Sequence, residues 1–299
     1  MPLLTKIKTQ LVVHSRRKVT GLLEGQYASM HAGRSLDFSD LRDYLPGDDV
    51  SDIDWKASAR TGSLLVKRYV ADRKHTLFLV VDTGREMAAL ADWDEADDSG
   101  EVKRELAIQA AGILGWIAIR HGDYVGLICR DEHGPTILRP STRELDLERM
   151  LELVEASCSD DSPAQDTREL LDYAIHSVRR RTIMVLITSG IDIDPETESM
   201  LRRLLVQHEL ILVTIADVDP TEPGRSGRNV RDVRTGRRFP GFAARSARLA
   251  GELAAVDAER RERRAASLTR LGVSSVELSN ADELLPALLA LLDGMRHAR

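Results

Sequence analysis

Charged side chains gather in one short stretch of this chain, on both sides of Pro46-Gly47. Proline fixes the first torsion of a tight turn and glycine permits a positive one, so this pair predicts a turn. A turn would bring the flanking charges close enough to form charge-assisted hydrogen bonds with one another. The sequence therefore predicts a charged network here, made of Arg42, Asp48, Asp49, Asp54 and Arg60.

Three kinds of chemistry fit such a network. It could fasten the N-terminal segment to the rest of the protein. It could form a docking surface for a partner, in which Trp55 would lie beside the charges. It could also be an acid–base or metal site, which would require converging carboxylates in an accessible cleft.

The elements that would position these residues follow an alternating pattern from residue 76 onward. Short apolar runs rich in β-branched residues predict strands at 76–82, 182–188 and 209–217, and a late strand at 273–279. YVGLICR and PTILRP are separated by turn residues and predict a hairpin. Helical spacing predicts helices near 101–120, 143–157 and 166–180, one opening at Asp194-Pro195, and a last helix with Pro286 in its early turns. We therefore expect an α/β fold with a mostly parallel sheet flanked by helices.

Two segments interrupt this alternation. Residues 1–75 are predicted to form an N-terminal extension that carries the charged motif, and residues 76–299 the α/β domain. Residues 218–242 are rich in proline, glycine and arginine and predict a long loop with a short hairpin around residues 234–236. The acidic run between Asp92 and Glu101 is expected to be a solvated loop.

The motif region resembles the domain of unknown function 58 family. In that family's pattern a Gly and an Asp-Phe pair lead into Leu-Arg-x-Tyr, then Gly-Asp, Ile-Asp-Trp and a small-Ala-Arg ending. The matching residues are Gly33, Asp37, Phe38, Leu41, Arg42, Tyr44, Gly47, Asp48, Ile53, Asp54, Trp55, Lys56, Ser58, Ala59 and Arg60. Ser51 and Asp52 stand where the family usually carries a basic residue. The resemblance implies a von Willebrand factor A-like domain downstream, and a partner-binding role for Arg42, Asp48, Asp54, Trp55 and Arg60.

Von Willebrand A-like domains often hold a divalent cation at the carboxyl end of the sheet, in a metal-ion-dependent adhesion site (MIDAS). Mg²⁺ takes six oxygen ligands, including hydroxyls and one or two carboxylates. The resemblance implies Asp82 and Thr167 as ligands, but Gly84 and Glu86 replace the two serines of the first loop, and Gly190 stands where an aspartate is expected. Glu86 or Asp192 could substitute. We expect a degenerate MIDAS without a cofactor, with an Mg²⁺ site at Asp82, Glu86, Thr167 and Asp192 as the alternative.

Bulk properties narrow the functional classes. The net charge of −6 argues against a protein that coats nucleic acid, although residues 221–270 contain 13 Arg against 6 Asp or Glu. That basic segment is expected to be a solvated helix face plus a loop. The two cysteines fit a reducing compartment, and the sequence shows neither a secretory signal nor an apolar run that could span a bilayer. We therefore expect a cytoplasmic protein.

The resemblance also implies a partner. Family members resemble partners of MoxR-type AAA+ ATPases that assemble or remodel a client complex. The chain has no GxxxxGK[ST] loop, so ATP chemistry would belong to the partner. We expect a non-enzymatic, chaperone-like adaptor. The alternative is a metal-dependent hydrolase that uses the Asp48 and Asp82 carboxylates.

Overall fold

The structure is a computed structural model of the chain. It describes residues 2–14, 23, 25, 27, 38–45, 48–69, 74–94, 99–219, 230–240 and 246–297. The expected turn at Pro46-Gly47 lies outside these residues, as do Gly33 and Asp37 of the family motif.

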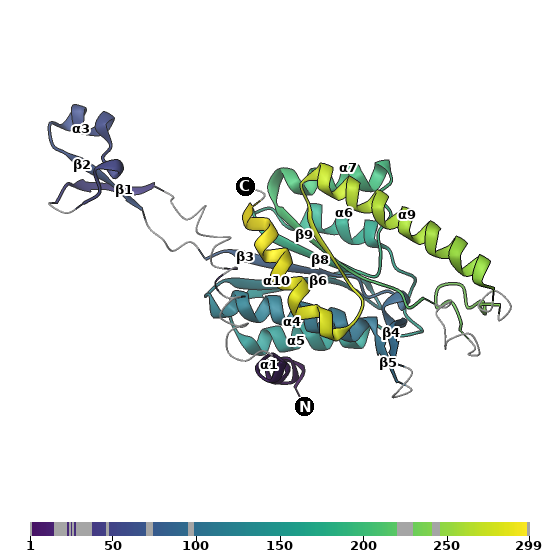
Figure 1. The fold of residues 1–299 in the computed structure, drawn as a ribbon. Coiled ribbons are helices and arrows are strands. Elements are labelled where there is room, and N and C mark those ends of the chain that lie inside the picture. Colours follow the sequence, from purple (N-terminus) through teal and green to yellow (C-terminus); the bar gives the residue numbers. More distant parts are fainter. Residues whose placement is uncertain are drawn as a thin grey trace.

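A six-stranded sheet forms the centre of the fold (Figure 1), in the order β10-β9-β8-β3-β6-β7. All neighbours are parallel except β6 and β7, which form the expected antiparallel hairpin. The expected mostly parallel α/β fold is confirmed. The strands are β3 (Thr76–Val81), β6 (Tyr124–Asp131), β7 (Gly134–Ser141), β8 (Ile183–Thr188), β9 (Glu209–Ile215) and β10 (Ser274–Leu278).

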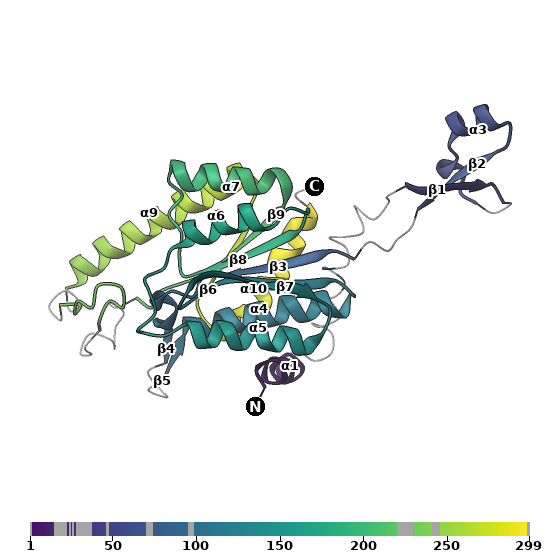
Figure 2. The same ribbon diagram turned by 180° about the vertical axis from the view of Figure 1, so that it is seen from behind.

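Helices cover both faces of this sheet because the central strands point apolar side chains to both faces. Leu77, Leu79 and Val81 of β3 face one core, and Phe78 and Val80 face the other. The first core is closed by α1 (Leu3–His14), α4 (Lys103–Arg120), α5 (Glu144–Ser157) and α10 (Ala281–His297), and the second by α6 (Thr167–Ser177), α7 (Pro195–Gln207) and the end of α9 (Ala247–Leu271) (Figure 2). Pro286 lies inside α10, as expected.

The apolar run from Ala107 to Ile119 is the buried centre of α4. Its small residues allow neighbouring elements to approach closely: a Cβ added at Gly112 would lie 2.4 Å from Cδ1 of Ile7. None of the helices among the described residues combines the length and the apolar character that crossing a bilayer requires.

Although α1 precedes residue 75, it packs on the α/β body. Leu4, Ile7 and Leu11 are buried in the same core as α4 and α5. The Glu148 carboxylate of α5 accepts hydrogen bonds from the backbone N–H groups of Leu3 and Leu4, at 2.6 and 2.7 Å. These two N–H groups belong to the first turn of α1, which has no intrahelical acceptor for them.

The family motif forms a small unit of its own, which we call the motif unit (residues 38–69). β1 (Phe38–Asp43) and β2 (Leu65–Tyr69) pair antiparallel, and η1 (Val50–Asp52) and α3 (Trp55–Thr61) lie between them. Figure 1 shows this unit apart from the main sheet. Ile53 and Val66 bridge to each other and are buried, so the unit has a minimal core.

Two elements go beyond or differ from the sequence prediction. The solvated helix predicted within the basic segment is α9, but its bounds were not predicted, because most of this helix is exposed and lacks an apolar face; it begins at the Ser246 cap and ends at Gly272, whose φ is +72°. The acidic run near residues 92–101 was expected to be a loop. Its described residues instead form the antiparallel pair β4 (Leu90–Asp94) and β5 (Ser99–Val102), preceded by η2 (Arg85–Ala88).

Candidate functional site

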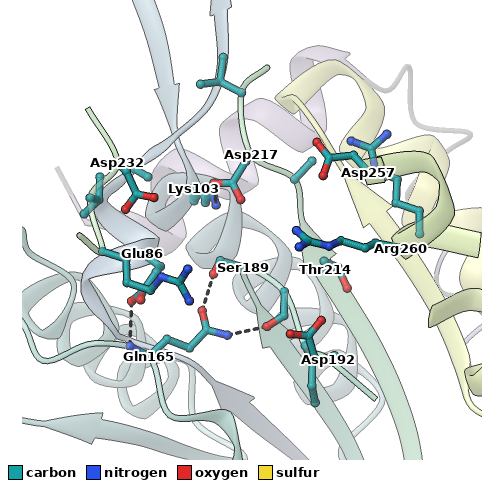
Figure 3. Close-up of a pocket in the computed structure, with 18 of the residues that line it drawn as sticks. Glu86, Lys103, Gln165, Ser189, Asp192, Thr214, Asp217, Asp232, Asp257 and Arg260 are labelled. Atoms are coloured by element: carbon teal, nitrogen blue, oxygen red, sulfur yellow. Dashed lines mark hydrogen bonds and ion pairs between the residues drawn. The ribbon is translucent and has the colours of Figure 1, made fainter. Parts of the chain in front are cut away.

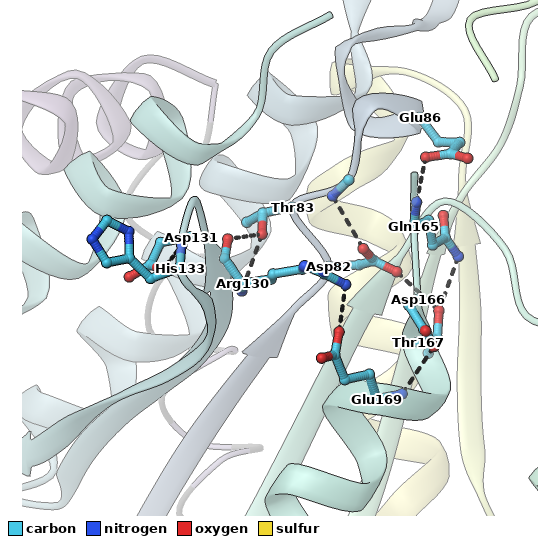
Figure 4. Close-up of polar contacts among 11 residues, drawn as sticks. Asp82, Thr83, Glu86, Arg130, Asp131, His133, Gln165, Asp166, Thr167 and Glu169 are labelled. Carbon is cyan, nitrogen blue, oxygen red and sulfur yellow. Dashed lines mark hydrogen bonds and ion pairs between the residues drawn. The ribbon is translucent and has the colours of Figure 1, made fainter. Parts of the chain in front are cut away.

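Asp82 lies at the point where the strand order of the sheet reverses. It follows β3 directly, and β8 next to β3 ends at Thr188, so the carboxyl ends of these two strands bring both residues to one place. Ligand sites of open α/β sheets usually form at such a switch point. Only 2% of Asp82 is exposed. Its carboxylate accepts hydrogen bonds from the Thr167 hydroxyl at 2.9 Å and from the Gly84 N–H at 3.2 Å (Figure 4).

The side chain of Gln165 occupies the space beside this carboxylate. Its amide nitrogen lies 2.9 Å from the hydroxyl oxygens of both Thr167 and Thr188, and 2.5 Å from the Gly190 carbonyl oxygen. Its amide oxygen accepts a hydrogen bond from the Ser189 hydroxyl. The Gln165 amide group therefore bonds to the hydroxyls that surround Asp82.

Gly84 permits this close approach of the Gln165 loop. A Cβ at position 84 would lie 2.5 Å from the backbone nitrogen of Gln165 and 2.6 Å from its Cα, so a serine at this position would collide with the backbone. Gly84 thus replaces a serine of the MIDAS pattern, and the Gln165 loop packs into the space that the serine side chain would fill.

Burial dominates the electrostatics of Asp82. Removing the carboxylate from water raises its pKa to about 6, while the hydrogen bonds from Thr167 and Gly84 act in the opposite direction. The negative charge of Glu86 adds to the increase. A carboxyl group in this setting can take up a proton close to neutral pH.

The four residues named as metal ligands do not all converge. Asp82 and Thr167 are in contact, whereas Glu86 accepts a hydrogen bond of 2.8 Å from the backbone N–H of Gln165. Asp192 is exposed. Within the described part of the chain, no group of three or more His, Cys, Asp or Glu side chains is arranged to hold a metal ion. Thr188 was missed by the sequence analysis, although a hydroxyl at the end of a buried strand could have signalled it.

The Arg42–Asp48 pair of the motif unit joins β1 to the residues just before η1. The guanidinium donates two hydrogen bonds of 2.7 Å to the two carboxylate oxygens, and the Leu45 N–H donates a third at 2.9 Å. The Arg42 hydrogen bonds hold the pKa of Asp48 below its usual range. This bidentate pair is the part of the expected charged network that forms as expected.

Asp54 serves a different structural purpose. Its carboxylate caps α3 by accepting hydrogen bonds from the backbone N–H groups of Lys56 and Ala57, at 3.1 and 2.9 Å. The buried Ser58 hydroxyl donates to the Asp54 carbonyl oxygen and accepts from the Leu65 N–H, each at 2.8 Å, which ties α3 to β2. Asp54 and Ser58 therefore build the scaffold of the unit.

The other two residues predicted to bind a partner point outward. Trp55 is 62% exposed, and Arg60 is exposed on the same helix, with its Nε 3.3 Å from the Lys56 carbonyl oxygen. Of the charges expected to form one network, Arg42 and Asp48 pair with each other, Asp54 caps α3, and Arg60 bonds to a carbonyl oxygen of its own helix. Exposed apolar side chains accompany Trp55 in this unit: Leu45, Val50 and Leu64.

A large cavity, here called the sheet-end groove, opens beside the Gln165 loop at the carboxyl end of the sheet (Figure 3). Its volume is about 2270 Å³, and it is bounded by the loops after β8 and β9, by residues 230–240 and by α9. Lys103, only 1% exposed, forms an ion pair with Asp217 in its wall. The groove was not predicted from the sequence, because the bounds of the helix in the basic segment could not be set without an apolar stripe.

Asp48 and Asp82 belong to different parts of the molecule. Asp48 lies in the motif unit, paired with Arg42, and Asp82 is buried at the end of β3. The two carboxylates share no site in this structure. A hydrolase that uses both of them would need them to converge in one accessible cleft.

Curated relatives are mycobacterial. An uncharacterized protein of Mycobacterium bovis and two of Mycobacterium tuberculosis are each 28% identical over 205 residues, which cover 68% of this chain and 62% of each relative. The chain thus spans less than two thirds of the length of these relatives.

Two solved structures similar to this chain have low sequence identity to it. An aerotolerance-related membrane protein from Bacteroides fragilis aligns with 74% of this chain and 99% of its own, at 13% identity and a TM-score of 0.43. A von Willebrand factor type A protein from Catenulispora acidiphila aligns with 78% of this chain and 44% of its own, at 10% identity and a TM-score of 0.39.

The family model described as "Protein of unknown function DUF58" matches residues 40–261. This range includes most of the motif unit, the central strands of the sheet and the first half of α9. The chain therefore belongs to the DUF58 family.

Proposed function

We propose that this protein is a non-enzymatic adaptor that docks a partner through its motif unit and works with a MoxR-type AAA+ ATPase on a client complex. The observation that carries the proposal is the exposure of Trp55. Other prominent motif residues are bonded within the unit: Arg42 and Asp48 to each other, and Asp54 and Ser58 at its helix. Trp55 is left with 62% of its surface in water.

Exposed apolar side chains of this kind favour protein contact. Leu45, Val50 and Leu64 are 60%, 59% and 47% exposed in the same small unit. Apolar surface gains free energy when it leaves water, and buried tryptophan and arginine often dominate the energy of an interface. Trp55 and Arg60 on α3 would supply both kinds of anchor.

The choice of partner class depends on the family resemblance of the motif. The chain carries no phosphate-binding loop, so an ATP-driven step would be carried out by the partner. We place this activity in the cytoplasm, where such an ATPase would find its nucleotide. The role needs no cofactor, and the packing of Gln165 among the hydroxyls around Asp82 supports a metal-free sheet end.

Affinity capture tests the proposal. The tagged full chain is incubated with lysate of its source cells, first with ATP and Mg²⁺ and then with EDTA, and the captured proteins are identified by mass spectrometry. We expect a MoxR-type ATPase with the unmodified chain, and its loss with Trp55→Ala. Val206→Ala is the matched control, because Val206 is 90% exposed on α7, outside the motif unit. Equal recovery with Trp55→Ala, or no such ATPase, would refute the proposal.

A further inference from the structure

The sheet-end groove has a basic wall that the proposed docking of the motif unit does not use. Among the described residues, five arginines that line it form no salt bridge, although the charge of one of them, Arg234, helps to lower the pKa of Asp232: Arg231, Arg234, Arg237, Arg238 and Arg260. Other arginines of the groove are neutralised. Arg261 and Arg264 both pair with Glu277, at 3.2 and 2.6 Å, and Arg270 pairs with Glu198 at 3.0 Å.

Four of the five arginines without a salt bridge lie on one short hairpin whose shape is held by its own hydrogen bonds. Its ends join through the Phe239 N–H, which donates to the Val230 carbonyl oxygen at 2.8 Å. Asp232 closes its turn, because the Asp232 carboxylate accepts a hydrogen bond of 2.7 Å from the Thr235 N–H. Gly236, with φ of +68°, completes the turn. The arginines are therefore displayed on a pre-formed backbone, so binding would not have to order that backbone.

The fifth arginine faces this hairpin from α9. Arg260 extends from the helix into the groove (Figure 3). The part of α9 that follows is anchored, because Leu268 is buried in the core and Arg264 pairs with Glu277 of β10. Positive charge thus lines two opposite walls, on two separately stabilised elements.

We propose that the sheet-end groove binds an acidic segment of a partner protein. Its volume of about 2270 Å³ exceeds the ~300–1,000 Å³ typical of small-molecule sites. Its charges are spread along a hairpin and a helix and do not converge on one point, as they would around a single phosphate. A chain that carries several carboxylates matches this distribution, and arginine pairs with carboxylates through two hydrogen bonds.

The carboxylates of the same groove argue against a nucleic acid. Asp232 and Asp257 line the groove together with the arginines, and they would repel a continuous phosphate backbone. Trp93 and Phe239 are the aromatic residues that line the described part of the groove, which gives little surface for stacking bases. A peptide can place its carboxylates opposite the arginines and leave neutral residues opposite the aspartates.

Fluorescence anisotropy with a labelled poly-glutamate peptide tests this inference at low ionic strength. The full chain should bind the peptide, and added salt should weaken binding because the contacts are exposed charges. Replacing two hairpin arginines, Arg234→Glu with Arg238→Glu, should reduce affinity about tenfold or more, equivalent to the loss of ~1.4 kcal/mol. A control pair, Arg139→Glu with Arg203→Glu, changes the net charge equally at exposed positions on β7 and α7 outside the groove and should change affinity less than about twofold.

Several outcomes would overturn the inference. These are no binding of poly-glutamate, equal weakening by both arginine pairs, or tighter hairpin-dependent binding of a single-stranded RNA oligonucleotide. Trp55→Ala should bind poly-glutamate as the unmodified chain does, so this test can fail or succeed independently of docking through the motif unit. Circular dichroism of each variant confirms that the fold is retained.

Discussion

The hydroxyl of Thr167 donates a hydrogen bond of 2.9 Å to Oδ2 of Asp82, which joins the first residue of α6 to the end of β3. Both residues are buried. In a MIDAS of the expected kind, the same two side chains would be metal ligands. Here the Thr167 hydroxyl also accepts a hydrogen bond from the Gln165 amide nitrogen. Hydrogen bonds within the protein therefore satisfy the carboxylate and hydroxyl oxygens that a metal ion would use.

Replacing Asp82 with asparagine should change how stability depends on pH. The folded-state pKa of Asp82 is raised from 3.8 to about 6, so its charged form costs stability above pH 6 and this cost disappears as pH falls toward 4. A shift of that size corresponds to about 3 kcal/mol at neutral pH. Asp82→Asn removes the charge and should stabilise the fold by up to that amount near pH 7.5. Urea unfolding of both proteins between pH 7.5 and 4.5 measures the difference, which should shrink as pH falls. A difference that stays constant with pH would contradict the buried, charged state of Asp82.

Glycine 84 should resist substitution by alanine. The added Cβ would lie 2.5 Å from the Gln165 backbone, and relieving such an overlap costs ~1–3 kcal/mol. Gly251→Ala is the matched control, because a Cβ there meets nothing within 4 Å and Gly251 lies in the exposed part of α9. That change should leave stability unaltered or raise it by up to about 1 kcal/mol. Thermal unfolding of both variants checks the contrast, and equal behaviour would show that the Gln165 loop can move aside.

Magnesium should have no effect on the unfolding temperature of the unmodified chain. The Gln165 amide nitrogen lies 2.9 Å from both hydroxyls that a cation beside Asp82 would need. Binding would have to displace that side chain and the contacts it makes with Ser189 and Gly190. Differential scanning fluorimetry with millimolar Mg²⁺ and with EDTA measures this directly. A magnesium-dependent rise of the unfolding temperature that Asp82→Asn abolishes would establish a metal site.

Removing the cap of α3 should loosen the motif unit without affecting the sheet. Asp54→Ala deletes two hydrogen bonds at the helix start, a loss that typically costs about 1 kcal/mol, whereas Asp54→Ser keeps a capping oxygen. Hydrogen exchange followed by mass spectrometry should show faster exchange at residues 55–66 in the alanine variant and unchanged exchange in β3. Faster exchange throughout the chain would mean that the unit and the sheet unfold together.

Burial explains which parts of this protein could be predicted from its sequence. β3 and β8 were predicted because their apolar runs are buried on both faces, which is the pattern of central parallel strands. The bounds of α9 could not be predicted because an exposed helix carries no apolar stripe, and the pair β4 and β5 was missed because its strands carry acidic residues. Short-range hydrogen bonds are easier to recognise in a sequence. The Asp54 carboxylate, for example, accepts from backbone N–H groups only two and three residues further along the chain.

Long-range contacts set the limit of this reasoning. Gln165 meets Glu86, Ser189 and Gly190 through loops that are distant in sequence, and a glutamine carries no distinctive chemical signal. Trp55 could be named from the family pattern, but its exposure follows from the way the unit folds. The sequence likewise could not show that Arg42 would pair with Asp48 while Arg60 faces solvent.

Surface plasmon resonance between the purified chain and a purified MoxR-type ATPase from the same organism tests the central claim most directly. The chain should bind the ATPase, and Trp55→Ala should weaken binding by at least about tenfold, as expected for an aromatic anchor worth more than ~1.4 kcal/mol. Val206→Ala should bind as the unmodified chain does. Unchanged affinity of Trp55→Ala, or equal loss in both variants, would contradict docking through the motif unit.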